Sequence, residues 1–287
     1  MNQAGAVHQV AAVQMTSVAD VETNLERAEE LIADAATAGA SLVLLPECFA
    51  TFGARPLADF AKAEYEHGRI RQFLADQALL HEVWLVGGSI PLPLSASGKA
   101  RASCLVFDPA GQQMARYDKL HLFDVEVADS HRSYRESADY QPGDEVVCVD
   151  TPAGRVGLSI CYDVRFPELY QALRYRGAGL IVVPSAFTRV TGAAHWEMLL
   201  RARAIETQCY ILAANQTGQH PGGRETFGHS CLIDPWGDII DCLPDGEGVV
   251  CGPLDSEHTE NIRARMPIAR HRRFALAETI VPVAKES

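Results

Sequence analysis

The chain has 287 residues, of which 47% are hydrophobic and 22% charged, and its formal net charge at pH 7 is −12. This composition is typical of a globular protein, and the negative charge argues against nucleic acid or an anionic membrane as the main partner. No apolar run approaches the roughly 20 residues that span a bilayer. The first residues lack a basic start followed by an apolar stretch, so we expect no signal peptide.

The eight cysteines show no C-x-x-C spacing, and most of them lie inside apolar runs. A disulfide framework and a structural zinc site are therefore both disfavoured. Most of these thiols are expected to be small buried side chains. We expect a cytoplasmic protein with reduced cysteines and without a metal or other cofactor.

The first half of the chain alternates short apolar runs with amphipathic segments. Helices are expected over 21–40, ending near Gly39, and over 57–80. Strands are expected at 7–15, 41–47, 82–90, 103–107 and 112–118, with the last two paired as a hairpin. Residues 124–143 are polar and irregular, which predicts a long loop of the kind that is often functional.

The second half continues the alternation. Strands are expected at 155–160, 179–184, 209–215, 228–234 and 238–242, and helices at 166–176 and 193–208. The segment 255–275 has a helical piece followed by the basic run "ARHRRF". Because no linker, composition break or fixed repeat is present, the sequence predicts one domain with helices packed around mixed sheets.

Three strand ends carry polar residues that packing alone does not explain. "SLVLLPE" ends in Glu47, "ARYDKLHLFD" contains Lys119, and "GLSIC" ends in Cys161. Each residue on its own is more often structural, as a surface carboxylate, a solvated amine or a core thiol. In α/β sheets, however, ligands bind beyond the carboxyl ends of strands, so the three side chains are expected to converge on one pocket.

Together these groups make a nucleophilic site. The ammonium, and the start of the following helix, would favour the thiolate of Cys161. The carboxylate of Glu47 could take the thiol proton and later activate water. Lys119, with the backbone N–H of Tyr162, could stabilise the oxyanion of a tetrahedral intermediate. Attack on an amide would then release an amine and leave a thioester for hydrolysis.

The segments "LLPECF" (44–49), "DKLHLFD" (118–124) and "CYDVRFPE" (161–168) resemble the three catalytic motifs of the nitrilase superfamily, the carbon–nitrogen hydrolases. The resemblance covers about residues 8–274 and leaves a tail at 275–287. It implies an α/β fold, a four-layer αββα sandwich with mixed sheets, which assembles as a homodimer or higher homo-oligomer. It also implies a triad of Glu47 as base, Lys119 as oxyanion stabiliser and Cys161 as nucleophile. A second glutamate, in "SYRESADYQPGD" (133–144), is placed at Glu136.

Within the superfamily, the segments at 184–218, 228–240 and 270–274 resemble the branch that contains deaminated glutathione amidase and ω-amidase. "LLRARAIETQCY" (199–210) is closer to the former, whereas "HLFDV" (121–125) is shared with the latter. The resemblance implies hydrolysis of amides of 2-oxo acids. Such substrates are anionic, so a cation is expected near the pocket.

Four further residues are candidates for binding the substrate. Arg165 is a candidate for a substrate carboxylate, with a local ion pair to Glu168 as the alternative. On family grounds, Phe187 and Thr191 are candidate pocket walls, with ordinary loop packing as the alternative. Tyr162 would contribute its backbone N–H.

Other features of the region are interpreted as structural. His195 and Trp196 are expected to fix the start of the helix at 193–208, and Glu197 and Arg201 to form a helix-surface pair.

Several other functions stay open or are disfavoured. An N-carbamoyl amino acid or aliphatic amide hydrolase would use the same triad, and a pseudo-enzyme that serves as an interaction module could share the fold. A Ser–His–Asp hydrolase is disfavoured because no G-x-S-x-G motif occurs. A metal hydrolase is disfavoured because the ten histidines show no H-E-x-x-H spacing.

Overall fold

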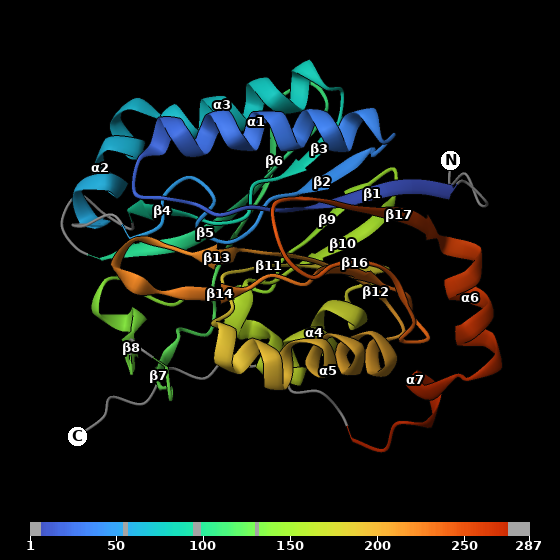
Figure 1. The fold of residues 1–287 in the computed structure, drawn as a ribbon. Helices are drawn as coiled ribbons and strands as arrows, with labels where there is room; N and C mark the ends of the chain where they lie inside the picture. The colour runs from blue at the N-terminus through green and yellow to red at the C-terminus, as the bar shows by residue number, and fades with distance from the viewer. Residues whose placement is uncertain (1–6, 54–56, 94–98, 130–131, 275–287) are drawn as a thin grey trace.

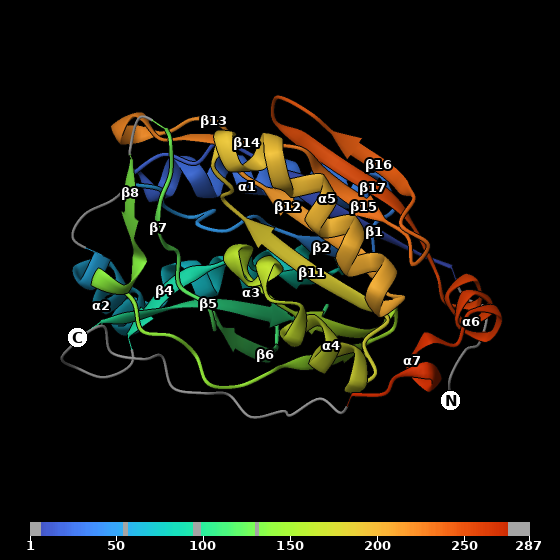
Figure 2. The same cartoon turned by 90° about the horizontal axis from the view of Figure 1, so that it is seen from below.

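In the computed structural model, which describes residues 7–53, 57–93, 99–129 and 132–274, two sheets are stacked and flanked by helices (Figure 1). Helices α1 (Val21–Thr37) and α3 (Arg69–Leu80) cover the outer face of one sheet. Helices α4 (Pro167–Tyr175) and α5 (Arg189–Thr207) cover the outer face of the other, as the view from below also shows (Figure 2). The predicted four-layer αββα sandwich is confirmed, and the predicted tail at 275–287 lies outside the described residues.

The first sheet has seven strands and the second has six. The first runs in the order β17 (Gly248–Asp255), β1 (Val7–Gln14), β2 (Leu42–Leu44), β3 (Trp84–Val86), β5 (Ala100–Phe107) and β4 (Ile90–Pro93), with β6 (Gln113–Asp118) also paired to β5. The second runs β16 (Ile239–Leu243), β15 (Ser230–Ile233), β12 (Tyr210–Asn215), β11 (Leu180–Ser185), β10 (Gly154–Leu158) and β9 (Cys148–Thr151). Both sheets mix parallel and antiparallel pairs.

Strand β1 shows how the layers are held together. Val10 and Ala12 join the apolar cluster between the two sheets, whereas Ala11 and Val13 join the cluster beneath α1 and α3. Alternate side chains of a strand point to opposite faces, so a strand buried on both faces is apolar at every position. This explains the nearly continuous apolar runs in the sequence.

The predicted elements are largely present, with differences that have local causes. The helix expected over 57–80 is two helices, α2 (Leu57–His67) and α3, because Gly68 between them has a φ of +63°. The strand expected at 82–90 is β3 and the start of β4, separated by a turn. Helix α5 starts at Arg189, before the expected residue 193.

The loop expected at 124–143 contains short regular elements. Strands β7 (Asp124–Glu126) and β8 (Ser133–Arg135) pair antiparallel and lead into the 3₁₀ turn Glu136–Ala138. A second small hairpin is formed by β13 (Thr217–Gln219) and β14 (Glu225–Phe227). The chain continues from β17 into α6 (Ser256–Arg265) and α7 (Ile268–His271). In the described ranges, no helix combines the length and apolar character needed to cross a bilayer.

Candidate active site

Glu47, Lys119 and Cys161 lie together in the folded chain, although they are distant in sequence. They follow strands β2, β6 and β10 respectively, and each is at least 90% buried. Lys119 Nζ is 2.8 Å from Glu47 Oε1. The thiol of Cys161 lies beside the carboxylate of Glu47, and the interaction between them shifts the pKa of both groups. The expected convergence of a carboxylate, an ammonium and a thiol is therefore observed.

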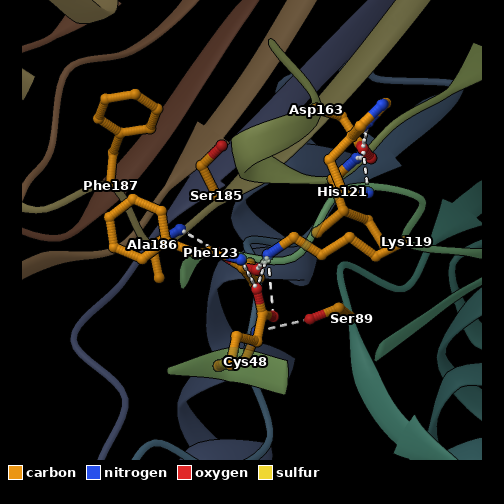
Figure 3. A network of polar contacts seen from close by, with 12 residues as sticks. Cys48, Ser89, Lys119, His121, Phe123, Asp163, Ser185, Ala186 and Phe187 are labelled. Atoms are coloured by element: carbon orange, nitrogen blue, oxygen red, sulfur yellow. Dashed lines mark hydrogen bonds and ion pairs between the residues drawn. The ribbon is translucent and has the colours of Figure 1, made fainter. Parts of the chain in front are cut away.

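Glu136 joins the same cluster from the other side of the ammonium. Both of its carboxylate oxygens are 3.0 Å from Lys119 Nζ, and Oε2 accepts a hydrogen bond of 2.6 Å from the backbone N–H of Phe123. The second oxygen of Glu47 accepts a 2.8 Å bond from the N–H of Ala186. Figure 3 shows Lys119 pointing toward the segments of Phe123 and Ala186, where these bonds converge.

Two carboxylates that share one ammonium have different proton affinities. Burial raises the pKa of Glu47, but Lys119 and the bond from Cys161 outweigh this and hold that pKa below its usual value. Burial and the charge of Glu47 together raise the pKa of Glu136. Both carboxylates raise the pKa of Lys119 well above its usual value despite burial. Titratable groups whose environments separate their pKa values are typical of acid–base sites.

Cys161 begins the 3₁₀ segment Cys161–Arg165 with a φ of +48°. This left-handed conformation is unusual for a residue with a side chain and is common at active sites. Burial, and then the negative charge of Glu47, raise the pKa of the thiol well above its usual range. The positive charge of Lys119 lowers the pKa of the thiol, as expected, but by less than burial and Glu47 raise it. The resting group is therefore a thiol beside a carboxylate, as a base that takes the thiol proton requires.

Asp163 joins the segments that carry Lys119 and Cys161. Its carboxylate is fully buried and accepts hydrogen bonds from the N–H of Ile160 (2.9 Å), the hydroxyl of Tyr117 (2.7 Å) and the N–H of His121 (3.1 Å). His121 Nδ1 is also 2.7 Å away, a contact drawn in Figure 3. One carboxylate therefore fixes the chain on both sides of the lysine against the turn of the cysteine. The sequence analysis did not single out this residue.

The cluster faces a cavity of about 530 Å³. Its wall includes Glu47, Lys119, Cys161 and Glu136, and also the candidates Tyr162, Phe187 and Thr191. Arg165 is absent from the described lining. Its guanidinium instead packs 5.1 Å from the ring of Phe187 and 3.4 Å from His195 Nδ1. The predicted contact between Arg165 and substrate therefore has no support in its position, because it lies behind the wall.

His195 and Trp196 do not start a helix as expected, because α5 begins at Arg189 and both lie inside it. His195 is exposed beside Arg165, and the buried Trp196 donates a 2.8 Å hydrogen bond to the carbonyl of His229. Glu197 and Arg201 form an exposed ion pair of 3.1 Å. Among the described residues, Arg165 forms no ion pair with Glu168, and its guanidinium lies beside His195 instead.

An arginine that the sequence analysis missed does line the cavity. Arg224 directly precedes β14, and its guanidinium is 4.8 Å from the ring of Phe52 and 5.1 Å from that of Tyr134. The signal available in the sequence was the dipeptide Gly222–Gly223, which indicates a turn but not where that turn lies in space. Among residues 7–53, 57–93, 99–129 and 132–274, no cluster of three or more His, Cys, Asp or Glu side chains is arranged to hold a metal.

The cluster combines a nucleophile, a base and a cation in a buried pocket, which is the equipment for acyl transfer through a thioester. A family model described as carbon–nitrogen hydrolase matches residues 9–264. The chain is 42% identical over 279 residues to a Yersinia enterocolitica protein named deaminated glutathione amidase, covering 97% of this chain and 96% of that protein. It is 38% identical over 268 residues to the human omega-amidase NIT2, covering 93% and 95%.

The fold agrees with these similarities. The crystal structure of Saccharomyces cerevisiae Nit3, a member of branch 10 of the nitrilase superfamily, superposes with a TM-score of 0.83. The two chains are 34% identical, and the match covers 93% of this chain and 97% of Nit3. The chain belongs to the carbon–nitrogen hydrolase family.

Proposed function

We propose that the protein is a thiol-dependent amidase that hydrolyses an amide of a small 2-oxo acid. The observation that carries this proposal is the hydrogen-bonded cluster of Glu47, Lys119 and Cys161 on the wall of a 530 Å³ cavity. The roles proposed for these residues are base, oxyanion stabiliser and nucleophile. Glu136 holds the ammonium of Lys119 in place.

In the first half of the reaction, the thiol proton of Cys161 passes to Glu47 as the sulfur attacks the amide carbon. The carbonyl oxygen becomes an oxyanion, which Lys119 Nζ and the backbone N–H of Tyr162 stabilise. Glu47 then gives its proton to the departing nitrogen. The C–N bond breaks, the amine leaves, and the acyl group stays on Cys161 as a thioester.

In the second half, Glu47 takes a proton from a water molecule that attacks the thioester carbon. The second oxyanion is held by the same two groups. The C–S bond breaks, the sulfur recovers the proton from Glu47, and the acid product leaves. The base is restored after each half, which requires a carboxylate that is ionised at neutral pH, and the lowered pKa of Glu47 provides this.

For the substrate, we propose deaminated glutathione, with 2-oxoglutaramate as the alternative. Relatives named deaminated glutathione amidase and omega-amidase both match over more than 90% of this chain. The segment 199–210 favours the former. Ammonia and amine release should be measured with both compounds, with N-carbamoyl amino acids and with short aliphatic amides. The proposal predicts the highest kcat/KM for deaminated glutathione. Faster turnover of N-carbamoyl amino acids or aliphatic amides would contradict it, and no turnover at all would favour a pseudo-enzyme.

We also propose that two copies of the chain pair through the outer face of α5, in the cytoplasm. This face exposes Met198 (75%) and Ile205 (50%), and Trp236 (54%) is also exposed. Exposed apolar patches of this kind commonly mark interfaces. All eight cysteines are free, which suits a reducing compartment. Met198→Glu should shift the elution volume in gel filtration toward the monomer, whereas Met114→Glu, on another exposed methionine, should not.

A further inference from the structure

Arg224 is held rigidly over the cavity. Its guanidinium lies between the rings of Phe52 and Tyr134, and all three residues line the cavity. One of its terminal nitrogens donates a 3.1 Å hydrogen bond to the carbonyl of Ala186. Stacking on two aromatic faces fixes the plane of the guanidinium and lowers the entropy lost when it binds an anion.

The hairpin that carries Arg224 is itself fixed to the body of the protein. His220 Nδ1 is 2.8 Å from the carbonyl of Ser17, and its Nε2 is 2.7 Å from the hydroxyl of Thr226. Burial lowers the pKa of His220 to about 4, so the ring is neutral and donates through Nδ1. Its other contact is with Phe52, at 4.1 Å between ring centroids. Arg224 therefore belongs to a stacked column that starts in the protein interior.

The guanidinium of Arg224 has no ion-pair partner in the described part of the chain, although it is near enough to Glu47 to lower the pKa of that carboxyl. No carboxylate there lies within ion-pair distance of the guanidinium, and its buried Nε has no hydrogen-bond partner. A buried donor without a partner is costly and calls for an explanation. The other cations on the cavity wall differ from it. Lys119 already contacts two carboxylates, and Arg135 is exposed.

We propose that Arg224 binds a carboxylate group of the substrate and is the residue that selects anionic amides over uncharged ones. This inference rests on the proposed amidase function and names the group that recognises its substrate class. A guanidinium offers paired N–H donors that match the two oxygens of a carboxylate. The role that the sequence analysis assigned to Arg165 thus passes to an arginine that faces the cavity.

The position of Arg224 also relates recognition to catalysis. The backbone N–H of Ala186 donates to Glu47, and the carbonyl of the same residue accepts the bond from Arg224. A carboxylate bound to Arg224 is therefore positioned by the same residue whose N–H orients the base. When the carboxylate of the substrate is bound to Arg224, the amide of the same substrate is held at a fixed position relative to Cys161. Holding reacting groups in a fixed orientation raises the rate of the reaction.

The test compares 2-oxoglutaramate with its uncharged methyl ester in wild type, Arg224→Met, Arg224→Lys and, as a matched control, Arg165→Met. Arg224→Met should lower kcat/KM for the anion about 10- to 150-fold, the range expected for a charged hydrogen bond. The ester should change by less than about threefold. For the anion, the kcat/KM of Arg224→Lys should lie between those of wild type and Arg224→Met, because lysine keeps the charge but lacks the paired N–H donors. Arg165→Met should leave the ratio of kcat/KM for the anion to kcat/KM for the ester unchanged.

A second measurement separates this inference from the proposed function. Calorimetric titration with 2-oxoglutarate, the acid product of both proposed reactions, reports carboxylate binding without turnover. If wild type hydrolyses neither compound but binds 2-oxoglutarate through Arg224, the proposed function fails, whereas the assignment of Arg224 as the carboxylate-binding residue stands. If Arg224→Met damages anion and ester equally, or leaves 2-oxoglutarate binding unchanged, Arg224 only supports the cavity wall and the inference is overturned.

Discussion

Lys119 Nζ lies 2.8 Å from Oε1 of Glu47, 72 positions earlier in the chain, and the two side chains are among the least exposed charged groups of the protein. Isolated charges are very costly to bury. Here the ammonium is balanced by Glu47 and Glu136, and each carboxylate also accepts a backbone N–H. The ion pair is therefore stable in the resting protein, and the ammonium of Lys119 is placed to hydrogen-bond an oxyanion when one forms.

Lys119→Ala should lower kcat by about 10²- to 10³-fold, because it removes one oxyanion donor. It should also leave Glu47 and Glu136 without their shared cation, which favours the protonated form of both. Steady-state kinetics at saturating substrate provides the measurement. Lys62→Ala is the matched control, since Lys62 is exposed and its ammonium pairs with the exposed Glu66. Activity of the Lys119 variant within a few-fold of wild type would show that Lys119 has no catalytic role.

The rate should depend little on pH between about 7 and 9. The pKa of Glu47 lies below its usual value, so the base stays ionised, and the pKa of Lys119 lies well above its own, so the cation stays charged. The raised pKa of Cys161 keeps the resting thiol protonated over the same range. The kcat/KM profile should therefore be flat. An isolated thiolate nucleophile with a pKa near 8.5 would instead give a rise of roughly tenfold or more.

Asp163→Asn should reduce both stability and kcat. In either orientation, the amide nitrogen of the introduced asparagine would point at a hydrogen-bond donor, on Tyr117 and Ile160 or on His121. A buried donor without an acceptor lowers the free energy of unfolding by about 1–3 kcal/mol. Because these bonds fix the segment of Lys119 against that of Cys161, kcat should fall even in the folded fraction. Urea unfolding and kcat, measured with Asp150→Asn on the exposed Arg155 pair as control, provide the test. Lost stability with unchanged kcat would limit Asp163 to a structural role.

His220 should make the protein less stable in acid. Its pKa in the fold is about 4, below the 6.5 of a free histidine. The unfolded chain therefore binds a proton first, and the stability present above pH 6.5 is lost as the pH falls toward 4. The difference corresponds to about 3 kcal/mol. His220→Asn should remove most of this part of the pH dependence in urea unfolding at pH 7 and 4.5. His195→Asn, at an exposed site, should not, and identical behaviour of the two variants would refute the assignment.

The sequence predicted the site better than it predicted the hairpins around it. Glu47 and Cys161 each follow an apolar run and Lys119 follows the more polar strand β6, and reactive side chains at strand ends are visible without a structure. Arg224 follows a glycine pair in a short hairpin, and nothing local indicates that this hairpin folds over Phe52 and Tyr134. Long-range placement of this kind depends on contacts such as the one between His220 and Ser17, across 203 positions.

The missed strand β17 has a similar explanation. Gly248, Gly252 and Pro253 lower its strand propensity, and Pro253 cannot donate a backbone hydrogen bond. The strand is nevertheless formed because it lies at the edge of the seven-stranded sheet and pairs only with β1. At an edge, one side of the backbone is free of pairing, and proline is tolerated there.

The most direct test of the account is the identity of the acylated residue. Wild type is mixed with deaminated glutathione, quenched in acid during turnover and analysed by peptide mass spectrometry, beside Cys161→Ala and Cys48→Ala. Cys48 is the matched control because it is a second thiol that lines the same cavity and follows the base directly in the chain. A 2-oxoglutaryl thioester is expected on Cys161 in wild type and Cys48→Ala, with no adduct or turnover in Cys161→Ala. An adduct on Cys48, or turnover by Cys161→Ala, would contradict it.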